Sequence, residues 1–268
     1  MPALTAVAPG SAPSLDDADA RLPDAPSKDD LHEKLAALAP ALDRRQTAMY
    51  ADGKRGLLVV LQARDAGGKD GVVRHVFGLF NPQGLAIRSF GVPTPPELSH
   101  DYLWRAHSAI GPRGVITVFN RSHYEDVLVV RVHGLVPEPV WQKRYDQINA
   151  FERMLVENGY GILKFFLHVS RDEQRERFED RLKDPEKSWK FRVGDLEERA
   201  RWDEYTAAYR DMLARCSTPE APWFVVPADS KPMRDLLIGE TLLQTLDGMG
   251  LKFPVADPAV LAWQGKVR

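Results

Sequence analysis

The sequence GLLVVLQARDAGGKDG, residues 56–71, joins a continuous apolar run to a turn that is rich in glycine. Most of the first seven residues are branched aliphatic side chains, the pattern of a short strand buried on both faces. A helical pattern follows from residue 69 to 80. The stretch therefore predicts a buried strand, a tight turn and a helix in immediate succession.

Four further apolar runs resemble this strand, and helical patterns separate them. The runs are 85–90, 115–119, 162–167 and 223–226, and the helical patterns are 28–49, 69–80, 96–109, 139–158, 171–182, 195–215 and 231–247. Alternating strands and helices favour a parallel sheet covered by helices on both faces. We expect a single α/β domain over residues 27–268, with three α/β/α layers around a central parallel sheet of about five strands.

Composition excludes several classes of protein. The formal net charge of the 268 residues is -2, so no global basic field attracts nucleic acid or an anionic membrane. No apolar run is long enough to span a bilayer, and the single cysteine excludes an internal disulfide framework. Residues 1–26 are rich in Ala, Pro, Ser and Asp, which predicts a flexible tail rather than a signal peptide. We expect a cytoplasmic protein that binds neither nucleic acid nor membrane.

The turn after the first strand resembles a phosphate-binding loop, or Walker A motif. That pattern is Gly, four residues, Gly-Lys and then Ser or Thr; here Ala63 stands first and Asp70 last. Gly67 and Gly68 let the backbone approach an anion, and Lys69 adds a cation for terminal phosphates. The context favours a phosphate site at the start of a helix. The alternative is a structural turn.

Asp65 is the candidate metal ligand of this loop. The Ser or Thr of the usual pattern supplies a hydroxyl to magnesium, and Asp70 replaces it here. A carboxylate is an oxygen ligand for a hard cation, either directly or through water. The alternative is a turn residue that bonds to its own backbone.

A second group of polar side chains follows the third strand, in the sequence FNRSHYED at residues 119–126. Ligands of parallel α/β sheets collect at the carboxyl ends of strands, so this segment should lie beside the loop. Asn120 could orient a metal-bound water or an acceptor phosphate, and Arg121 suits bidentate binding of phosphate. Glu125 or Asp126 could accept a hydrogen bond from the exocyclic amine of a base.

The interval between the fourth and fifth strands, residues 170–217, is long for a simple crossover. It carries the cations Arg175, Arg177, Arg181, Lys183, Lys187, Lys190 and Arg192, interleaved with acidic residues. These residues could form two solvated helices with helix-pair charges. Alternatively, they form a mobile lid that brings cations over a phosphate site.

Three motifs together resemble the family-2 polyphosphate kinases: residues 62–71, 119–127 and 184–191. The resemblance covers residues 30–253 in the family's order, and the NRSHYED form is similar to the subgroup that phosphorylates both nucleoside monophosphates and diphosphates. It implies a thymidylate-kinase-like P-loop fold with a two-helix lid. It also implies inorganic polyphosphate as donor, magnesium or manganese as cofactor, and a homodimer or homotetramer.

The resemblance also assigns roles to residues. It implies that Asp65 and Lys69 handle the transferred phosphoryl group and its metal, and that Asn120 and Arg121 hold the acceptor's phosphate. The phosphate-binding set is Ala66, Gly67, Gly68, Lys69, Asp70, Gly71, Arg177, Arg181, Lys187 and Lys190. Asn120 departs from the aspartate of the diphosphate-specific members, which leaves open which group orients the attacking oxygen.

The predicted function is magnesium-assisted, reversible, in-line transfer of the terminal phosphoryl group of polyphosphate to AMP and ADP, and to other purine nucleotides. Such chemistry needs positioning and neutralised charge more than a general base. Two alternatives are an ATP-dependent nucleoside monophosphate kinase and a non-catalytic regulator that binds polyphosphate or nucleotide.

Overall fold

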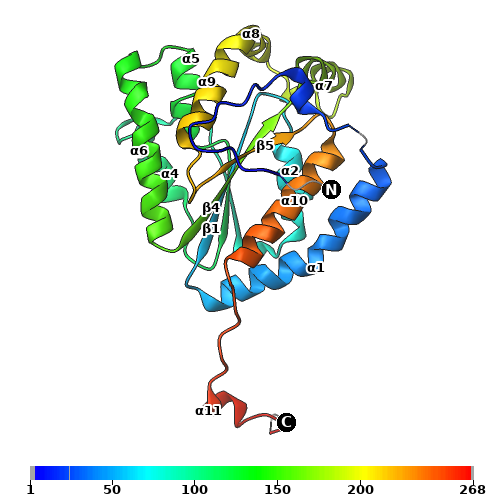
Figure 1. Ribbon diagram of the computed structural model, residues 1–268, viewed down its shortest axis with the longest axis vertical. Helices are drawn as coiled ribbons and strands as arrows, with labels where there is room; N and C mark the ends of the chain where they lie inside the picture. Colours follow the sequence, from blue (N-terminus) through cyan, green and yellow to red (C-terminus); the bar gives the residue numbers. More distant parts are fainter. Residues whose placement is uncertain (1–3, 24, 267–268) are drawn as a thin grey trace.

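The computed structural model describes residues 4–23 and 25–266, which form a parallel sheet between two layers of helices (Figure 1). The strands are β1 (Gly56–Ala63), β2 (Leu85–Ser89), β3 (Ile116–Asn120), β4 (Tyr160–His168) and β5 (Trp223–Pro227). Their order in the sheet is β2-β3-β1-β4-β5, and every neighbouring pair is parallel. The predicted five-stranded parallel sheet is therefore confirmed.

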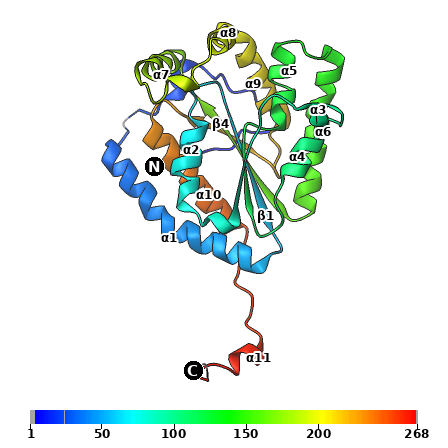
Figure 2. The ribbon, with the colours of Figure 1, turned by 180° about the vertical axis from the view of Figure 1, so that it is seen from behind.

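The alternating residues of β1 explain why that strand reads as a continuous apolar run. Leu57, Val59 and Leu61 face one hydrophobic core, and Leu58 and Val60 face the other. Helices α1 (Lys28–Asp52), α2 (Lys69–His75) and α10 (Lys231–Gly248) cover the first face, and α4 (Trp104–Ala109), α6 (Glu138–Glu157) and α9 (Trp202–Cys216) cover the second (Figure 2). The three-layer α/β/α fold is confirmed.

Several predicted helices are interrupted. The pattern at 96–109 forms α3 (Pro95–Leu98) and α4, and the pattern at 195–215 forms α8 (Gly194–Ala200) and α9, with the break at Arg201. The remaining elements are α5 (Val129–Val132), α7 (Arg171–Lys183), α11 (Pro258–Leu261) and the 3-10 helices η1 (Asp17–Ala20), η2 (Phe77–Leu79), η3 (Pro82–Gly84), η4 (His123–Asp126) and η5 (Ser188–Lys190).

The N-terminal segment differs from the flexible tail that its composition predicts. Ala6 forms an antiparallel bridge with Phe224 of β5, and the Val7 amide donates to the Trp223 carbonyl at 2.8 Å. Leu15 is only 4% exposed within the second core. The physical reason is that β5 is an edge strand, whose free backbone groups the segment satisfies.

The C-terminal residues 251–266 extend away from the helices and carry α11 (Figure 1). None of the helices in the described residues combines the length and the apolar character needed to cross a bilayer.

Candidate functional site

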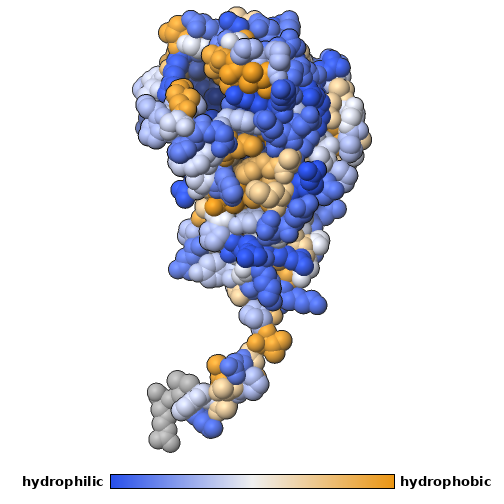
Figure 3. Space-filling view, turned by 90° about the vertical axis from the view of Figure 1, so that its left-hand side faces the viewer, coloured by the Kyte–Doolittle hydropathy of each residue, from blue (hydrophilic) through white to orange (hydrophobic). Residues whose placement is uncertain are grey.

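A cavity of about 1400 Å³ opens at the carboxyl edge of the sheet. Every site residue that the sequence predicts lines it: Asp65, Ala66, Gly67, Gly68, Lys69, Asp70, Gly71, Asn120, Arg121, Glu125, Asp126, Arg177, Arg181, Lys187 and Lys190. Figure 3 shows that the surface is hollowed near the end of the molecule opposite the C-terminal extension. The phosphate loop, the segment after β3 and the segment after β4 therefore meet around one space, as the edge argument predicts.

The loop after β1 owes its shape to its glycines. Gly68 has φ +99°, and a Cβ atom there would lie 2.0 Å from Nη1 of Arg234. A Cβ atom on Gly67 would lie 2.6 Å from the Cβ of Ala63. Both positions exclude a side chain on steric grounds. With glycine at these two positions, the backbone of the loop can approach a ligand more closely than it could with any residue that has a side chain.

Lys69 lies beneath the loop rather than out in solvent. Its side chain is 9% exposed, and Nζ donates to the carbonyl of Ala63 at 2.9 Å. The pKa of Lys69 is lowered to about 8, chiefly by burial and then by the charge of Arg121, against the opposing effect of Asp65. An anion bound beside Nζ would favour the charged form, so phosphate binding and protonation of Lys69 are linked.

Asp65 and Arg121 join the loop to the segment after β3. Nη2 of Arg121 lies 2.6 Å from Oδ1 of Asp65, and the Asp65 carbonyl accepts from Nε2 of Gln174 at 2.8 Å. Arg121 has φ +61°, a conformation that costs energy for a residue with a side chain. Burial opposes the charge of Arg121, but Glu125 and Asp65 outweigh burial and raise its pKa. Arg121 thus combines a strained backbone with a permanently charged guanidinium, and it lines the cavity.

Asp70, which replaces the usual hydroxyl residue, connects three segments. Its Oδ1 accepts from Nδ2 of Asn120 at 2.9 Å, and its Oδ2 lies 3.8 Å from Nζ of Lys190. Lys190 belongs to η5, within the interval predicted to form a lid. The amide of Asn120 is thus held toward the loop, and one lid cation reaches the loop.

The two carboxylates predicted to bind a base already have protein partners. Oε1 of Glu125 accepts from Nε2 of Gln62 at 3.2 Å. Oδ1 of Asp126 accepts from Nη1 of Arg144 at 2.7 Å, and Oδ2 lies 3.9 Å from Arg105. The pKa of Asp126 is raised to about 6, chiefly by burial, against the opposing effect of Arg144. Recognition of a base by either carboxylate stays a prediction.

The lid residues divide into one buried and several exposed cations. Arg177 of α7 is 6% exposed and donates to the carbonyls of Ala66, at 2.9 Å, and Ala228. It therefore braces the loop itself. Lys187 is exposed and pairs with Asp184, and Arg181 is partly exposed. These two can reach a ligand without breaking the fold.

Arg234 is a site residue that the sequence reasoning missed. It is 1% exposed, Nε and Nη2 donate to Oδ1 of Asp235, and it lines the cavity from the first turn of α10. Among the described residues, its Nη1 has no hydrogen-bond partner. The order of elements in the sequence does indicate this position, because α10 begins directly after the carboxyl end of β5, at the same edge of the sheet as the loop.

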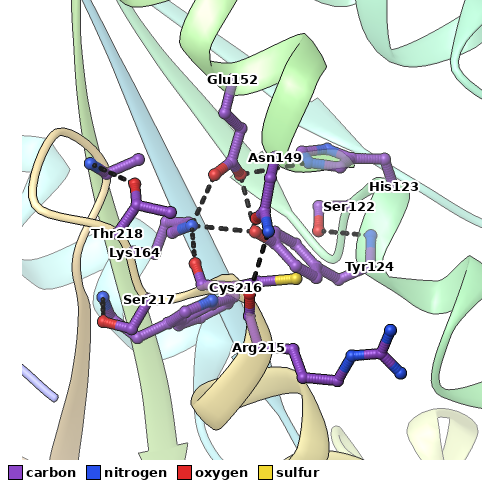
Figure 4. A network of polar contacts seen from close by, with 12 residues as sticks. Ser122, His123, Tyr124, Asn149, Glu152, Lys164, Arg215, Cys216, Ser217 and Thr218 are labelled. Atoms are coloured by element: carbon purple, nitrogen blue, oxygen red, sulfur yellow. Dashed lines mark hydrogen bonds and ion pairs between the residues drawn. The ribbon is translucent and has the colours of Figure 1, made fainter. Parts of the chain in front are cut away.

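In the segment after β3, a buried polar network holds η4 in place (Figure 4). Nζ of Lys164 contacts Oε2 of Glu152 at 2.5 Å, the Tyr124 hydroxyl at 2.8 Å and the Cys216 carbonyl at 2.7 Å. Tyr124 also donates to Glu152 at 2.8 Å. Burial alone would raise the pKa of Glu152, but Lys164 and His123 lower it below its usual value. The network therefore fixes Tyr124 of η4, which follows Arg121 by three residues.

Asp65 and Asp70 are the carboxylates that the loop offers to a metal ion. Within residues 4–23 and 25–266, no three His, Cys, Asp or Glu side chains gather as a metal-binding group. Magnesium typically takes only one or two carboxylates and completes its shell with substrate phosphates and water. The loop therefore fits a cation that binds together with phosphate rather than a structural ion.

Comparisons with known proteins agree with this geometry. Residues 25–254 match the family model described as Polyphosphate kinase 2 (PPK2). A relative from Meiothermus ruber, named AMP/ADP-polyphosphate phosphotransferase, is 53% identical over 227 residues, 85% of this chain and 85% of that protein. One from Rhodopseudomonas palustris, named ADP-polyphosphate phosphotransferase, is 44% identical over 245 residues, 87% of this chain and 85% of that protein.

The fold comparison gives the same result. The crystal structure of Polyphosphate Kinase 2 from Arthrobacter aurescens TC1 matches with a TM-score of 0.88 at 38% identity, and the match covers 100% of both chains. With most of its length matched in sequence and all of it in fold, the chain belongs to the polyphosphate kinase 2 family.

Proposed function

We propose that this protein is a polyphosphate:nucleotide phosphotransferase that moves the terminal phosphoryl group of inorganic polyphosphate to AMP and ADP. The transfer is reversible and extends to other purine nucleotides. One observation carries the proposal: a single cavity joins the phosphate loop, the cations after β4 and a recess with apolar walls. The names of the relatives from Meiothermus ruber and Rhodopseudomonas palustris support the same donor and acceptors.

The recess suits the nucleoside part of the acceptor. Its walls include Phe90, Val92, Leu98, Tyr102, Val129 and Val136. Nη1 of Arg105 donates to the Gly91 carbonyl at 3.0 Å, and the Arg105 guanidinium lies 5.3 Å from the centre of the Phe90 ring. A purine can insert its faces between apolar side chains while Asp126 lies within the same cavity. The acceptor phosphate would then point toward Arg121.

The residues divide the work of an in-line transfer. Lys69 neutralises charge on the transferred phosphoryl group, and Arg121 holds the acceptor phosphate by its planar guanidinium. The attacking group is already an ionised phosphate oxygen at neutral pH, so the transfer needs no strong general base. Lys187 and Arg181 supply charge from the lid side. The main contribution of the protein is orientation together with preorganised positive charge.

We assign magnesium, with manganese as a substitute, to the loop. Asp65 would hold the ion, and the ion would neutralise charge on the phosphates when bound. The carboxylate of Asp65 also fixes the guanidinium of Arg121 at 2.6 Å, so its removal affects two functions. Activity should therefore be lost on chelation and recovered on addition of either cation.

We also propose a cytoplasmic homodimer or homotetramer. The C-terminal extension exposes the apolar side chains of Phe253, Val255, Val260, Leu261 and Trp263. Exposed apolar side chains that lie together are typical of a surface that contacts another protein chain. Removal of residues 252–268 should lower the oligomer number in sedimentation velocity experiments if this extension joins the copies.

The donor assay tests the proposal. Purified protein is incubated with AMP and magnesium, together with either ATP or polyphosphate, and nucleotides are separated by chromatography. We expect ADP and then ATP from polyphosphate. If ADP forms only with ATP, the protein is a nucleoside monophosphate kinase. If both substrates bind without turnover, the protein is a regulator.

A further inference from the structure

The phosphate loop contains an arginine whose side chain lies outside the large cavity. Arg64 directly precedes Asp65, and its side chain is only 7% exposed. Of the described residues that line the cavity, Asp65 and Ala66 are members, whereas Arg64 is not. Its guanidinium instead lies 3.9 Å from the centre of the Trp202 ring. Arg64 therefore does not contact a substrate held in the cavity.

Arg64 binds the chain at the break between α8 and α9. Arg201 ends α8, and Trp202 is the first residue of α9. Nη1 of Arg64 donates to the Trp202 carbonyl at 3.2 Å, and Nη2 donates to the Thr206 hydroxyl. A planar guanidinium can stack on a ring and donate at the same time, so these contacts fix its orientation. Arg201 ties the same break to α5, because its Nη1 donates to the Val132 carbonyl at 3.0 Å.

Charge alone does not favour a cation at this position. Burial lowers the pKa of Arg64 to about 10, and the charge of Arg171 lowers it further, against the opposing effect of Tyr209. The N-terminus of α9 is the positive end of that helix, which also disfavours a cation. The stacking on Trp202 and the two hydrogen bonds therefore hold Arg64 against an electrostatic cost.

Helix α7 is attached to the next two residues of the loop. Nε2 of Gln174 donates to the Asp65 carbonyl at 2.8 Å, and Nη1 of Arg177 donates to the Ala66 carbonyl at 2.9 Å. Nη1 of Arg199, in α8, donates to Oε1 of Gln174 at 2.9 Å. Figures 1 and 2 both show α7 and α8 at the end of the molecule opposite the C-terminal extension. Both helices that flank the segment 184–193 are thus tied to the loop.

We propose that Arg64 is a positioning residue, which sets the α8–α9 break against the phosphate loop and so places the segment 184–193 over the cavity. That segment carries Lys187 and Lys190, which line the cavity. Gln174 and Arg177 fix its first end through α7, and Arg64 fixes its second end. The proposal rests on the proposed function, because it concerns where these cations stand during phosphoryl transfer.

The distance from this segment to a distant helix reports the positioning without any turnover. Spin labels at Glu186→Cys and Lys34→Cys, both exposed, are compared by double electron–electron resonance with and without Arg64→Met. Cys216 is buried, so the labels attach to the introduced cysteines. We expect a narrow distance distribution with Arg64 and a broader one in Arg64→Met. Arg171→Met is the matched control, since Arg171 is exposed and lies 5.4 Å from the centre of the same Trp202 ring. It should keep the narrow distribution.

Steady-state kinetics gives a second readout. In Arg64→Met, kcat with AMP and polyphosphate should fall roughly tenfold or more while both KM values stay within about twofold, because misplaced cations fail chiefly in the transition state. Trp202→Phe keeps a ring face and the backbone carbonyl and should keep kcat. Trp202→Leu removes the ring face and should lower kcat. Circular dichroism shows whether each variant is folded.

Wild-type distances and a wild-type kcat in folded Arg64→Met would overturn the positioning role. Equal changes in Arg171→Met would also overturn it, because they would trace to charge near Trp202 rather than to the bonds of Arg64. If Arg64→Met does not fold, Thr206→Val and Trp202→Leu decide, and unchanged distances in both would overturn the role. If the distances change as expected but the wild type transfers no phosphoryl group, the positioning role stands and the proposed function fails.

Discussion

Arg121 Nη2 lies 2.6 Å from Asp65 Oδ1, so the guanidinium assigned to the acceptor phosphate is balanced by the carboxylate assigned to the metal ion. The two residues come from different motifs: Asp65 belongs to the phosphate loop, and Arg121 directly follows β3. Binding of phosphate at Arg121 would compete with this ion pair. The arrangement thus couples the acceptor side of the site to the donor side.

Replacement of Arg121 should impair acceptor binding more than donor binding. Arg121→Lys keeps the charge but loses the planar fork of the guanidinium. We expect kcat/KM for AMP to fall roughly thirtyfold, which corresponds to a loss of about 2 kcal/mol in transition-state stabilisation. The KM for polyphosphate should change little. Steady-state kinetics with each substrate varied in turn measures both values. A variant whose polyphosphate KM rises while its AMP KM stays normal would reverse the assignment.

The lowered pKa of Lys69 predicts a pH dependence of donor use. Lys69 is cationic below its pKa of about 8 and becomes neutral as the pH rises through that value. Because the cation binds phosphate, kcat/KM for polyphosphate should fall with increasing pH above about 8. Since kcat/KM reports the free enzyme, bound phosphate does not obscure this pKa. A profile that stays level to pH 9.5 or so would contradict the assignment.

The buried network beneath η4 predicts a large effect on stability. Lys164→Met leaves Glu152 buried without its cation, which should lower the free energy of unfolding by about 3–5 kcal/mol. The double variant Lys164→Met with Glu152→Gln should lose less, because no unpaired charge remains. Urea denaturation measures both values. Equal losses in the single and double variants would show that charge pairing is not the cause.

The preference for AMP over GMP tests whether the carboxylates beside the recess recognise the base. Glu125→Gln or Asp126→Asn should weaken the preference for AMP over GMP if either carboxylate accepts from the adenine amine. The ratio of kcat/KM values should change by a factor that corresponds to about 1.5–3 kcal/mol, the net effect of one hydrogen bond to a charged group. Because Asp126 also holds Arg144 at 2.7 Å, Arg144→Lys serves as the control for lost positioning. An unchanged ratio in both carboxylate variants would place base recognition elsewhere.

The parts of the fold that local patterns determine could be predicted from the sequence. The strand before residue 63 is apolar on both faces, and the glycines after it have a direct steric role. The edge rule for parallel sheets then placed Asn120 and Arg121 beside Lys69, and all three line one cavity. These inferences needed only neighbouring residues and the order of elements.

Other features depend on long-range contacts that no local pattern reports. Arg234 becomes a site residue only because α10 begins at the loop's edge of the sheet, and Arg105 and Arg144 only because both face Asp126. The N-terminal segment has the composition of a tail, yet the free edge of β5 supplies partners for Ala6 and Val7. Composition describes a segment and says nothing about the surface on which it lies.

We propose that the loop of residues 63–71 carries the phosphoryl transfer from polyphosphate to AMP. The most direct measurement is the rate of ADP formation from AMP, magnesium and polyphosphate by the wild type and by Lys69→Ala, with circular dichroism to show that both are folded. We predict rapid transfer by the wild type and a loss of about 3 kcal/mol or more in the variant, on the order of a hundredfold. Near-normal turnover by folded Lys69→Ala would show that the loop does not take part in the transfer.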